Sequence, residues 1–145
     1  MPQSALSTAL RRLGQRPYTR REISDYLTRR NYAAEEVSAA LTRLIELGYL
    51  DDLEAARATV RYRELHPRGR LLVARELRHR GLDATTVELA LLDYDERSLA
   101  RELAKRLAAQ GKSQEAVQRA LINRGFRSAS VLAATEDGSA EVDLS

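Results

Sequence analysis

An internal repeat constrains the fold of this chain more than any other feature, because a unit that recurs along a sequence must fold in much the same way each time. Three segments align without gaps, with Leu, Arg, Val and Ala at identical offsets, over residues 26–40, 76–90 and 120–134. An aliphatic residue stands four positions before each of these leucines, which gives the pairs Ile23/Leu27, Val73/Leu77 and Val117/Leu121. Residues four apart share one face of a helix, so each segment begins within an amphipathic helix.

Each segment then predicts a tight turn and a second helix. Asn31, Gly81 and Gly125 fall just past the last turn of the first helix, and Asn and Gly tolerate the left-handed conformation that closes a helix. A further helix precedes each pair, over about residues 5–16, 53–66 and 95–109. The sequence therefore predicts an all-α protein of three tandem three-helix, helix-turn-helix-like repeats that form an elongated, curved array.

The repeat boundaries follow from this pattern. We expect the repeats over residues 1–50, 51–93 and 94–135, followed by an acidic, disordered tail over residues 136–145. Each repeat has about 45 residues, which is close to the lower limit for independent folding. Each repeat should therefore need its neighbours, as in other repeat proteins.

Residues that favour helix N-caps stand before several of the predicted helices. Thr19, one of the pair Asp51 and Asp52, and Asp83 are expected to cap the helices that follow them. Ala33 and Arg127 hold the place of Asp83 in the other repeats and are poor caps. An adjacent Asp pair can also suggest a metal site, but before a helix it is far more often a cap.

The composition excludes several classes of function. The 145 residues contain no cysteine, so disulfides, thiolate catalysis and cysteine-based metal sites are excluded. His66 and His79 lack a helical His partner, and neither a phosphate-binding glycine loop nor a serine nucleophile motif is present. We therefore expect a binding protein and not an enzyme, with no cofactor and no metal. With no signal peptide or membrane span indicated, we expect a cytoplasmic protein with no membrane partner, and we expect a monomer.

Arginine dominates the basic residues. Of the 24 basic residues all but Lys105 and Lys112 are Arg, and the net charge is +3 although residues 136–145 hold four acids and no base. Arg makes planar, bidentate contacts to phosphate or carboxylate groups, which favours an acidic macromolecular partner. A GC-rich genome also favours arginine codons, so the excess of Arg over Lys has a second explanation.

The densest basic stretch supplies the candidate partner-binding residues, which are Arg57, Arg61, Tyr62, Arg68, Arg70, Arg75 and Arg78. Arg57 and Arg61 are four residues apart and therefore share one face of their helix. Such a surface suits the acidic groups of a protein filament or the phosphates of DNA. The alternative is a solvated face whose arginines pair with nearby acids, namely Glu54, Glu64 and Glu76.

Two further sets of residues allow more than one interpretation. Arg30, Arg80 and Arg124 occupy identical places in the three segments, which suggests either a repeated phosphate contact or a repeated helix end. We favour cations that offset the helix dipole at each C-terminus, worth about 0.3–1 kcal/mol each. Exposed tyrosines can stack on bases, but Tyr49 is predicted to lie in the core, which leaves Tyr62 as the candidate contact.

The order and spacing of short motifs resemble those of the RecX family, the small regulators of the RecA recombinase. The middle repeat carries residues 48–52 (GYLDD), 60–61 (VR), 68–70 (RGR), 76–77 (EL) and 80–82 (RGL), and the first repeat carries residues 18–23 (YTRREI). The resemblance covers about residues 5–135, and its third repeat matches least well. Leu53 and Ala33 depart from the acidic residues that the family often has at these places.

This resemblance implies a function. Proteins of the RecX type consist of three tandem three-helix repeats, lie in the groove of the RecA filament on single-stranded DNA, and inhibit its ATPase and strand exchange. Some also bind DNA directly. The resemblance therefore implies that this chain binds the RecA filament, inhibits both activities and thereby modulates recombination and DNA repair.

Two other functions compete with this expectation. A nonspecific DNA-binding helical-repeat protein, on single- or double-stranded DNA, is the main alternative, and a structural adaptor is another. Sequence-specific DNA recognition is disfavoured because the third helix of each repeat is poor in the residues that read bases. Residues 34–47 hold one Arg against three Glu, residues 84–92 hold Glu88 as their one charge, and residues 128–135 hold no charge.

Overall fold

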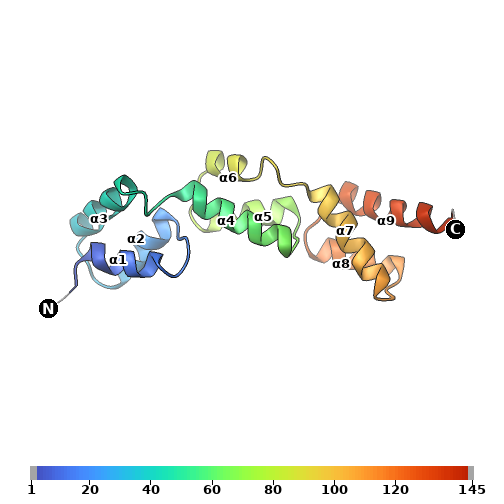
Figure 1. Cartoon of the computed structure of the whole chain (residues 1–145), viewed down its shortest axis with the longest axis horizontal. Helices are drawn as coiled ribbons and strands as arrows, with labels where there is room; N and C mark the ends of the chain where they lie inside the picture. The colour runs from blue at the N-terminus through green and yellow to red at the C-terminus, as the bar shows by residue number, and fades with distance from the viewer. Residues whose placement is uncertain (1–2, 144–145) are drawn as a thin grey trace. The chain divides into compact units, whose positions relative to one another are not determined.

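The computed structural model describes residues 3–143, with side chains described as far as Glu136. Within this part of the chain there are nine α-helices and no strand, which confirms the predicted all-α class (Figure 1). The helices are α1 (Ala5–Leu13), α2 (Arg20–Arg29), α3 (Ala34–Glu46), α4 (Asp52–Leu65), α5 (Arg70–His79), α6 (Ala84–Ala90), α7 (Glu96–Ala109), α8 (Gln114–Asn123) and α9 (Ser128–Asp143). Among the described residues, no helix combines the length and the apolar character that crossing a membrane requires.

The predicted left-handed turns close α2, α5 and α8. The backbone φ is 69° at Asn31, 91° at Gly81 and 82° at Gly125. In each turn the amide of the next residue donates to a carbonyl five residues earlier, with N–O distances of 3.2–3.3 Å for Tyr32 to Leu27, Leu82 to Leu77 and Phe126 to Leu121. These are the hydrogen bonds of a Schellman motif, which satisfies carbonyls that the helix end leaves without partners. The internal repeat therefore encodes one turn three times.

The helix caps also follow the sequence. Thr19 accepts a hydrogen bond from the amide of Glu22, and the carboxylate of Glu22 accepts one from the amide of Thr19, which completes a capping box. Asp51 accepts from the amide of Glu54 at 3.2 Å, and Asp83 accepts from that of Thr86 at 2.8 Å. The expected cap residues are confirmed at these helices, and Ala33 makes no side-chain cap before α3, as predicted.

The chain divides into two compact units. The first comprises Met1–Thr59 with Glu76–Ala90, and the second comprises Val60–Arg75 with Leu91–Ser145. The core of the first unit is built on Ile23, Leu27 and Leu44, which expose no surface, and that of the second on Ala100 and Leu121, which are likewise fully buried. Three helices begin within each predicted repeat, whereas the units share the helices of the middle one, so the repeat boundaries stay a prediction.

One expectation needs correction. Tyr49 was expected in the core but is 59% exposed, because Gly48 adopts a left-handed φ of 79° and the chain turns so that Leu50 is buried instead, at 3% exposed. The backbone of α9 extends to Asp143, and the disordered tail over residues 136–145 stays a prediction. Residues 144 and 145 of the predicted tail lie outside the described residues.

Candidate partner-binding surface

Helix α4 presents the first of the predicted contact residues to solvent. Ala55, Ala56 and Val60 are buried, whereas Arg57 and Arg61 are exposed one turn apart on the opposite face. This arrangement follows from the helical period. The small apolar residues and the arginines of α4 each recur at intervals of about one turn, so each kind gathers on its own side of the helix.

The end of α4 carries an exposed aromatic pair. The ring of Tyr62 is 52% exposed and stacks on the ring of His66, with centroids 4.3 Å apart and planes inclined by 23°. The guanidinium of Arg63 lies 5.1 Å from the centre of the Tyr62 ring. The His66 ring and the Arg63 guanidinium hold the tyrosine side chain in one orientation while leaving half of its surface open to a partner.

The loop between α4 and α5 is fixed by hydrogen bonds within the second unit. The hydroxyl of Tyr94 accepts from the amide of Arg68 and donates to the carbonyl of the same residue. The amide of Gly69 donates to the carbonyl of Arg124 at 2.8 Å. Burial raises the pKa of the Tyr94 phenol, although the bond to Arg68 opposes this, so the hydroxyl keeps the proton that it donates. The exposed Arg68 side chain therefore projects from a backbone held on both sides.

The predicted arginines divide into two kinds. Arg70 is half-buried, and its Nη1 donates to the carbonyl of Leu91 at 2.7 Å, so this side chain serves the interior of the second unit. By contrast, Arg57, Arg68, Arg75 and Arg78 are exposed, and none pairs with a carboxylate among the described residues.

The predicted set also does not fall within one compact unit. Arg57 and Arg78 belong to the first unit. The second unit holds the other candidates, which are Arg61, Tyr62, Arg68, Arg70 and Arg75.

Sequence reasoning missed a first junction, formed in the first unit by residues 19–22 at the start of α2, by Asp52 and by residues 80–81 after α5. The guanidinium of Arg80 donates two hydrogen bonds, of 2.7 and 3.0 Å, to the carboxylate of Glu22. It also donates to Thr59 Oγ1 at 2.7 Å and to the Pro17 carbonyl at 3.1 Å. Arg80 was predicted to serve its own helix end, but its contacts reach across 58 positions of sequence, which no local pattern reveals.

The carboxylate of Glu22 is stabilised in its charged form by this environment. Burial on its own would raise the pKa of Glu22, but the hydrogen bonds from Arg80 and from the Thr19 amide outweigh it and hold the pKa below its ordinary value of 4.5. The Glu22 and Arg80 side chains are 24% and 14% exposed. Removal of either partner would leave a partly buried charge without its counter-ion, so this ion pair serves the fold and is not available to a partner.

A second junction repeats this plan in the second unit, where residues 69–72 at the start of α5 meet Glu96 and residues 124–127. Glu96 is 3% exposed, and its carboxylate accepts from the Arg70 amide at 2.8 Å, from Ser130 Oγ at 2.7 Å and from Arg127 Nε at 2.9 Å. Burial alone would raise the pKa of Glu96, yet the bonds from Ser130, Arg127 and Arg70 keep it lowered. No sequence motif marked Glu96, because its partners lie 26 to 34 residues away.

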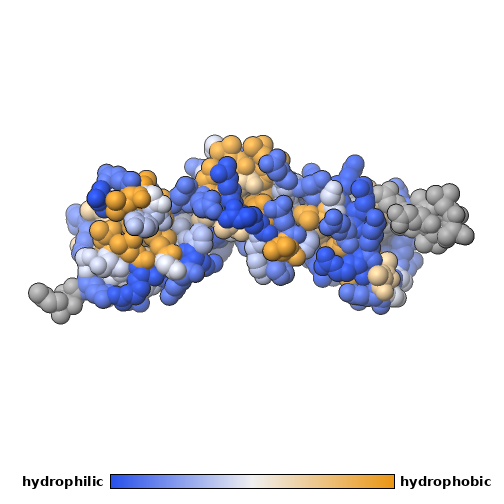
Figure 2. Space-filling model, in the orientation of Figure 1, coloured by the Kyte–Doolittle hydropathy of each residue, from blue (hydrophilic) through white to orange (hydrophobic). Residues whose placement is uncertain are grey.

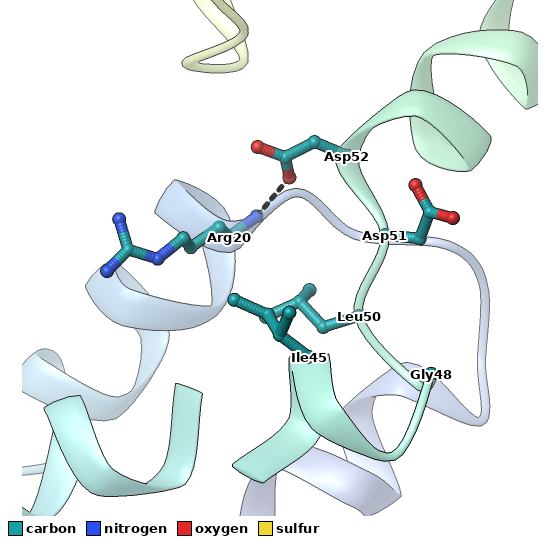
Figure 3. A pocket seen from close by; sticks show the side chains of 6 residues that line it. All are labelled: Arg20, Ile45, Gly48, Leu50, Asp51 and Asp52. Carbon is teal, nitrogen blue, oxygen red and sulfur yellow. Dashed lines mark hydrogen bonds between the residues drawn. The ribbon is translucent and has the colours of Figure 1, made fainter. Parts of the chain in front are cut away.

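The adjacent carboxylates of Asp51 and Asp52 line an open hollow of about 310 Å³ (Figure 3). The two side chains diverge: Asp52 accepts from the backbone amide of Arg20 at 2.7 Å, while Asp51 accepts from the amide of Leu53 at 3.0 Å. Each carboxylate thus accepts from an amide at the N-terminus of a helix, Asp52 at α2 and Asp51 at α4. No group of three or more metal-binding side chains gathers among the described residues. The arrangement fits the predicted capping role of this pair.

Comparison with known proteins gives a consistent result. The profile described as "RecX, first three-helix domain" matches residues 5–44, which contain α1 and α2 and most of α3. The chain is 33% identical over 129 residues to "Regulatory protein RecX" of Pelodictyon phaeoclathratiforme, a match that covers 84% of this chain and 81% of the relative. It is 38% identical over 94 residues to the protein of the same name in Mycobacterium sp. (strain JLS), covering 64% of this chain but 51% of that relative.

The fold has a close counterpart among solved structures. The crystal structure of RecX from Lactobacillus salivarius superposes with a TM-score of 0.80, covering 97% of this chain and 96% of that chain. The sequence identity is 24%, so this likeness supports the fold.

Proposed function

This chain belongs to the RecX family, and we propose that it is a regulator that binds the RecA recombinase filament and inhibits its ATPase and strand exchange. Such inhibition modulates recombination and DNA repair. The proposed action is binding and not catalysis, which is consistent with the use of the Glu22 and Glu96 carboxylates in hydrogen bonds within the two junctions. RecA is the partner implied by the family, and the residues of α4 and α5 are the proposed points of contact.

The observation that carries this proposal is the set of exposed arginines without an acidic partner. Arg57, Arg68, Arg75 and Arg78 are solvent-exposed and unpaired within the described part of the chain. Arg80, by contrast, is bound to the carboxylate of Glu22, and the guanidinium of Arg70 donates to the Leu91 carbonyl. Because Arg is favoured at interfaces for its bidentate contacts and stacking, unused arginines on two successive helices support an acidic macromolecular partner.

The first experiment separates action on the filament from capture of DNA. ATP hydrolysis by RecA on single-stranded DNA is titrated with the chain, first at saturating DNA and then with a tenfold excess of DNA. A regulator of the filament inhibits to the same final level in both titrations. A nonspecific DNA binder, the alternative function, loses its effect when DNA is in excess, and that result would contradict the proposal.

Charge reversal then locates the contact. The triple variant Arg57→Glu, Arg68→Glu and Arg75→Glu should inhibit RecA at least about tenfold more weakly, since each interfacial charge contact contributes on the order of 1 kcal/mol or more. The matched control reverses three other exposed arginines, with Arg97→Glu, Arg106→Glu and Arg119→Glu, which changes the net charge equally. Equal loss in both variants would show that total charge matters and that these three positions do not.

A further inference from the structure

Two exposed leucines flank the fixed loop between α4 and α5 in the second unit. Leu65, the last residue of α4, is 74% exposed, and Leu71, in the first turn of α5, is 64% exposed. Hydrophobic atoms are visible at this turn in the space-filling view, beside hydrophilic surface (Figure 2). A single exposed leucine is ordinary, but two that bracket one rigid loop form a candidate contact.

The sequence around these leucines is strongly basic. Residues 60–75 contain five arginines and one acid, Glu64. Arg61 precedes Leu65 by one helical turn, and Arg75 follows Leu71 by one turn, so each leucine shares a helix face with an arginine. Arg68 lies between the two leucines in sequence, at the tip of the loop. A surface with this pattern is complementary to apolar groups surrounded by carboxylates.

The loop needs little ordering on binding. Pro67 restricts the backbone at its start, the Tyr94 hydroxyl holds both polar groups of Arg68, and the Gly69 amide is bonded to the Arg124 carbonyl. Preorganised contact residues lose less conformational entropy when they bind, which raises affinity without additional contacts. Leu65, Arg68 and Leu71 are therefore presented from a backbone already fixed within the second unit.

We propose that Leu65, Arg68 and Leu71, here called the α4–α5 knob, form an anchor that inserts into an apolar protein surface bordered by carboxylates. Phosphate recognition makes no use of two exposed leucines, whereas protein interfaces pair an apolar centre with a charged rim. The proposal deepens the proposed function, on which it rests, by assigning the anchor of the contact with the RecA filament to this loop. Tyr62, half-exposed on the same helix as Leu65, extends the contact.

The test removes the apolar part of the α4–α5 knob without changing charge. The double variant Leu65→Ser and Leu71→Ser is compared with the control Ile122→Ser and Leu132→Ser, whose side chains are 59% and 52% exposed elsewhere in the second unit. Affinity for RecA filaments on single-stranded DNA is measured beside affinity for the same DNA without RecA, by biolayer interferometry. Helicity by circular dichroism verifies that both variants fold.

If the α4–α5 knob is the anchor, the test variant should bind filaments at least about tenfold more weakly than wild type, as expected when anchor residues are truncated. The control should bind them as wild type does. Arg68→Glu should weaken filament binding similarly, whereas Arg68→Lys should retain part of it. If wild type and test variant bind filaments equally, the knob is overturned and the proposed function stands. If the test variant loses naked-DNA affinity in parallel, the loop is a nucleic-acid contact instead. If wild-type protein does not bind filaments at all, the proposed function and the knob both fail.

Discussion

The two junctions share a backbone plan. In each, a carboxylate at the start of a following helix accepts from the first amide of the earlier one: Asp52 from Arg20 at 2.7 Å and Glu96 from Arg70 at 2.8 Å. In each, the carbonyl of an arginine at a helix end also accepts a hydrogen bond. The Arg80 carbonyl accepts from Thr19 Oγ1 at 2.7 Å, and the Arg124 carbonyl accepts from the Gly69 amide at 2.8 Å.

The side chains that complete the two junctions are nevertheless different. The first junction is closed by the ion pair between Glu22 and Arg80. In the second, Leu72 lies against Gly125, and Gly69 packs so tightly that a Cβ atom there would lie 1.7 Å from the Gly125 carbonyl oxygen. The helix-end arginine thus pairs with a carboxylate in the first junction, whereas the second adds close backbone packing to its Glu96 contacts, and the variants below test these features separately.

The largest effect is expected from Gly69→Ala. The added methyl group collides with backbone and not with a flexible side chain, so the second junction must open, at about 3 kcal/mol or more. Urea unfolding measures this loss. Gly14→Ala is the matched control, because its φ is −67° and its nearest neighbour would lie at 3.4 Å, so its stability should stay close to wild type. Similar losses in both variants would remove close packing as the basis of the second junction.

Removal of the buried carboxylate should rank next. Glu96→Ala leaves the Arg70 amide and the Ser130 hydroxyl without their acceptor inside the second unit, which we expect to lower the free energy of unfolding by about 2–3 kcal/mol. The measurement is again urea unfolding, followed by circular dichroism. A loss below about 0.5 kcal/mol, the range of ordinary surface substitutions, would mean that Glu96 does not hold the second junction together.

The same substitution at two equivalent arginines gives the sharpest contrast. Arg80→Lys loses the bidentate grip on Glu22 and should cost about 1–2 kcal/mol. Arg124→Lys should cost no more than a few tenths of a kcal/mol, since Arg124 Nη1 donates to Ala120 of its own helix at 3.3 Å. Thermal unfolding of the two variants side by side is sufficient. Equal losses would show that the arginines have the same role in both junctions.

The smallest effect concerns acid stability. The pKa values of Glu22 and Glu96 are lowered in the folded protein, so the stability they contribute is fully present above their ordinary value of 4.5 and is lost as pH falls through the lowered values. Glu22→Gln and Glu96→Gln should each flatten the fall in stability below about pH 4.5, with exposed Glu102→Gln as control. If stability below about pH 4.5 falls in both variants as it does in wild type, the lowered pKa values are contradicted.

Features that depend on neighbouring residues could be predicted from the sequence. The left-handed turns at Asn31, Gly81 and Gly125 and the cap at Thr19 were expected, because a helix end is determined within about six residues. The exposure of Tyr49 was missed because Tyr49 and Leu50 are both apolar enough to fill the place in the core after Gly48. The conformation of the turn determines which of them is buried.

The candidate site could be predicted in part. Arg57, Arg68, Arg75 and Arg78 were recognised by charge density and are indeed exposed, but density did not distinguish Arg70, whose guanidinium is bound to the Leu91 carbonyl. Whether an arginine faces solvent or an acceptor far along the chain depends on tertiary packing. The alignment of the three repeats could not reveal the first junction either. Glu22 stands three residues after Thr19, but the equivalent position, three residues after Gly69, holds Leu72.

A direct binding measurement tests whether this chain recognises the RecA filament. The chain is sedimented with RecA filaments assembled on single-stranded DNA, and in parallel with the same DNA without RecA at equal nucleotide concentration and physiological salt. We predict that it pellets with the filaments at concentrations where it remains in solution with naked DNA. Equal association with both, or association with naked DNA alone, would contradict recognition of the filament and favour a nonspecific DNA-binding protein.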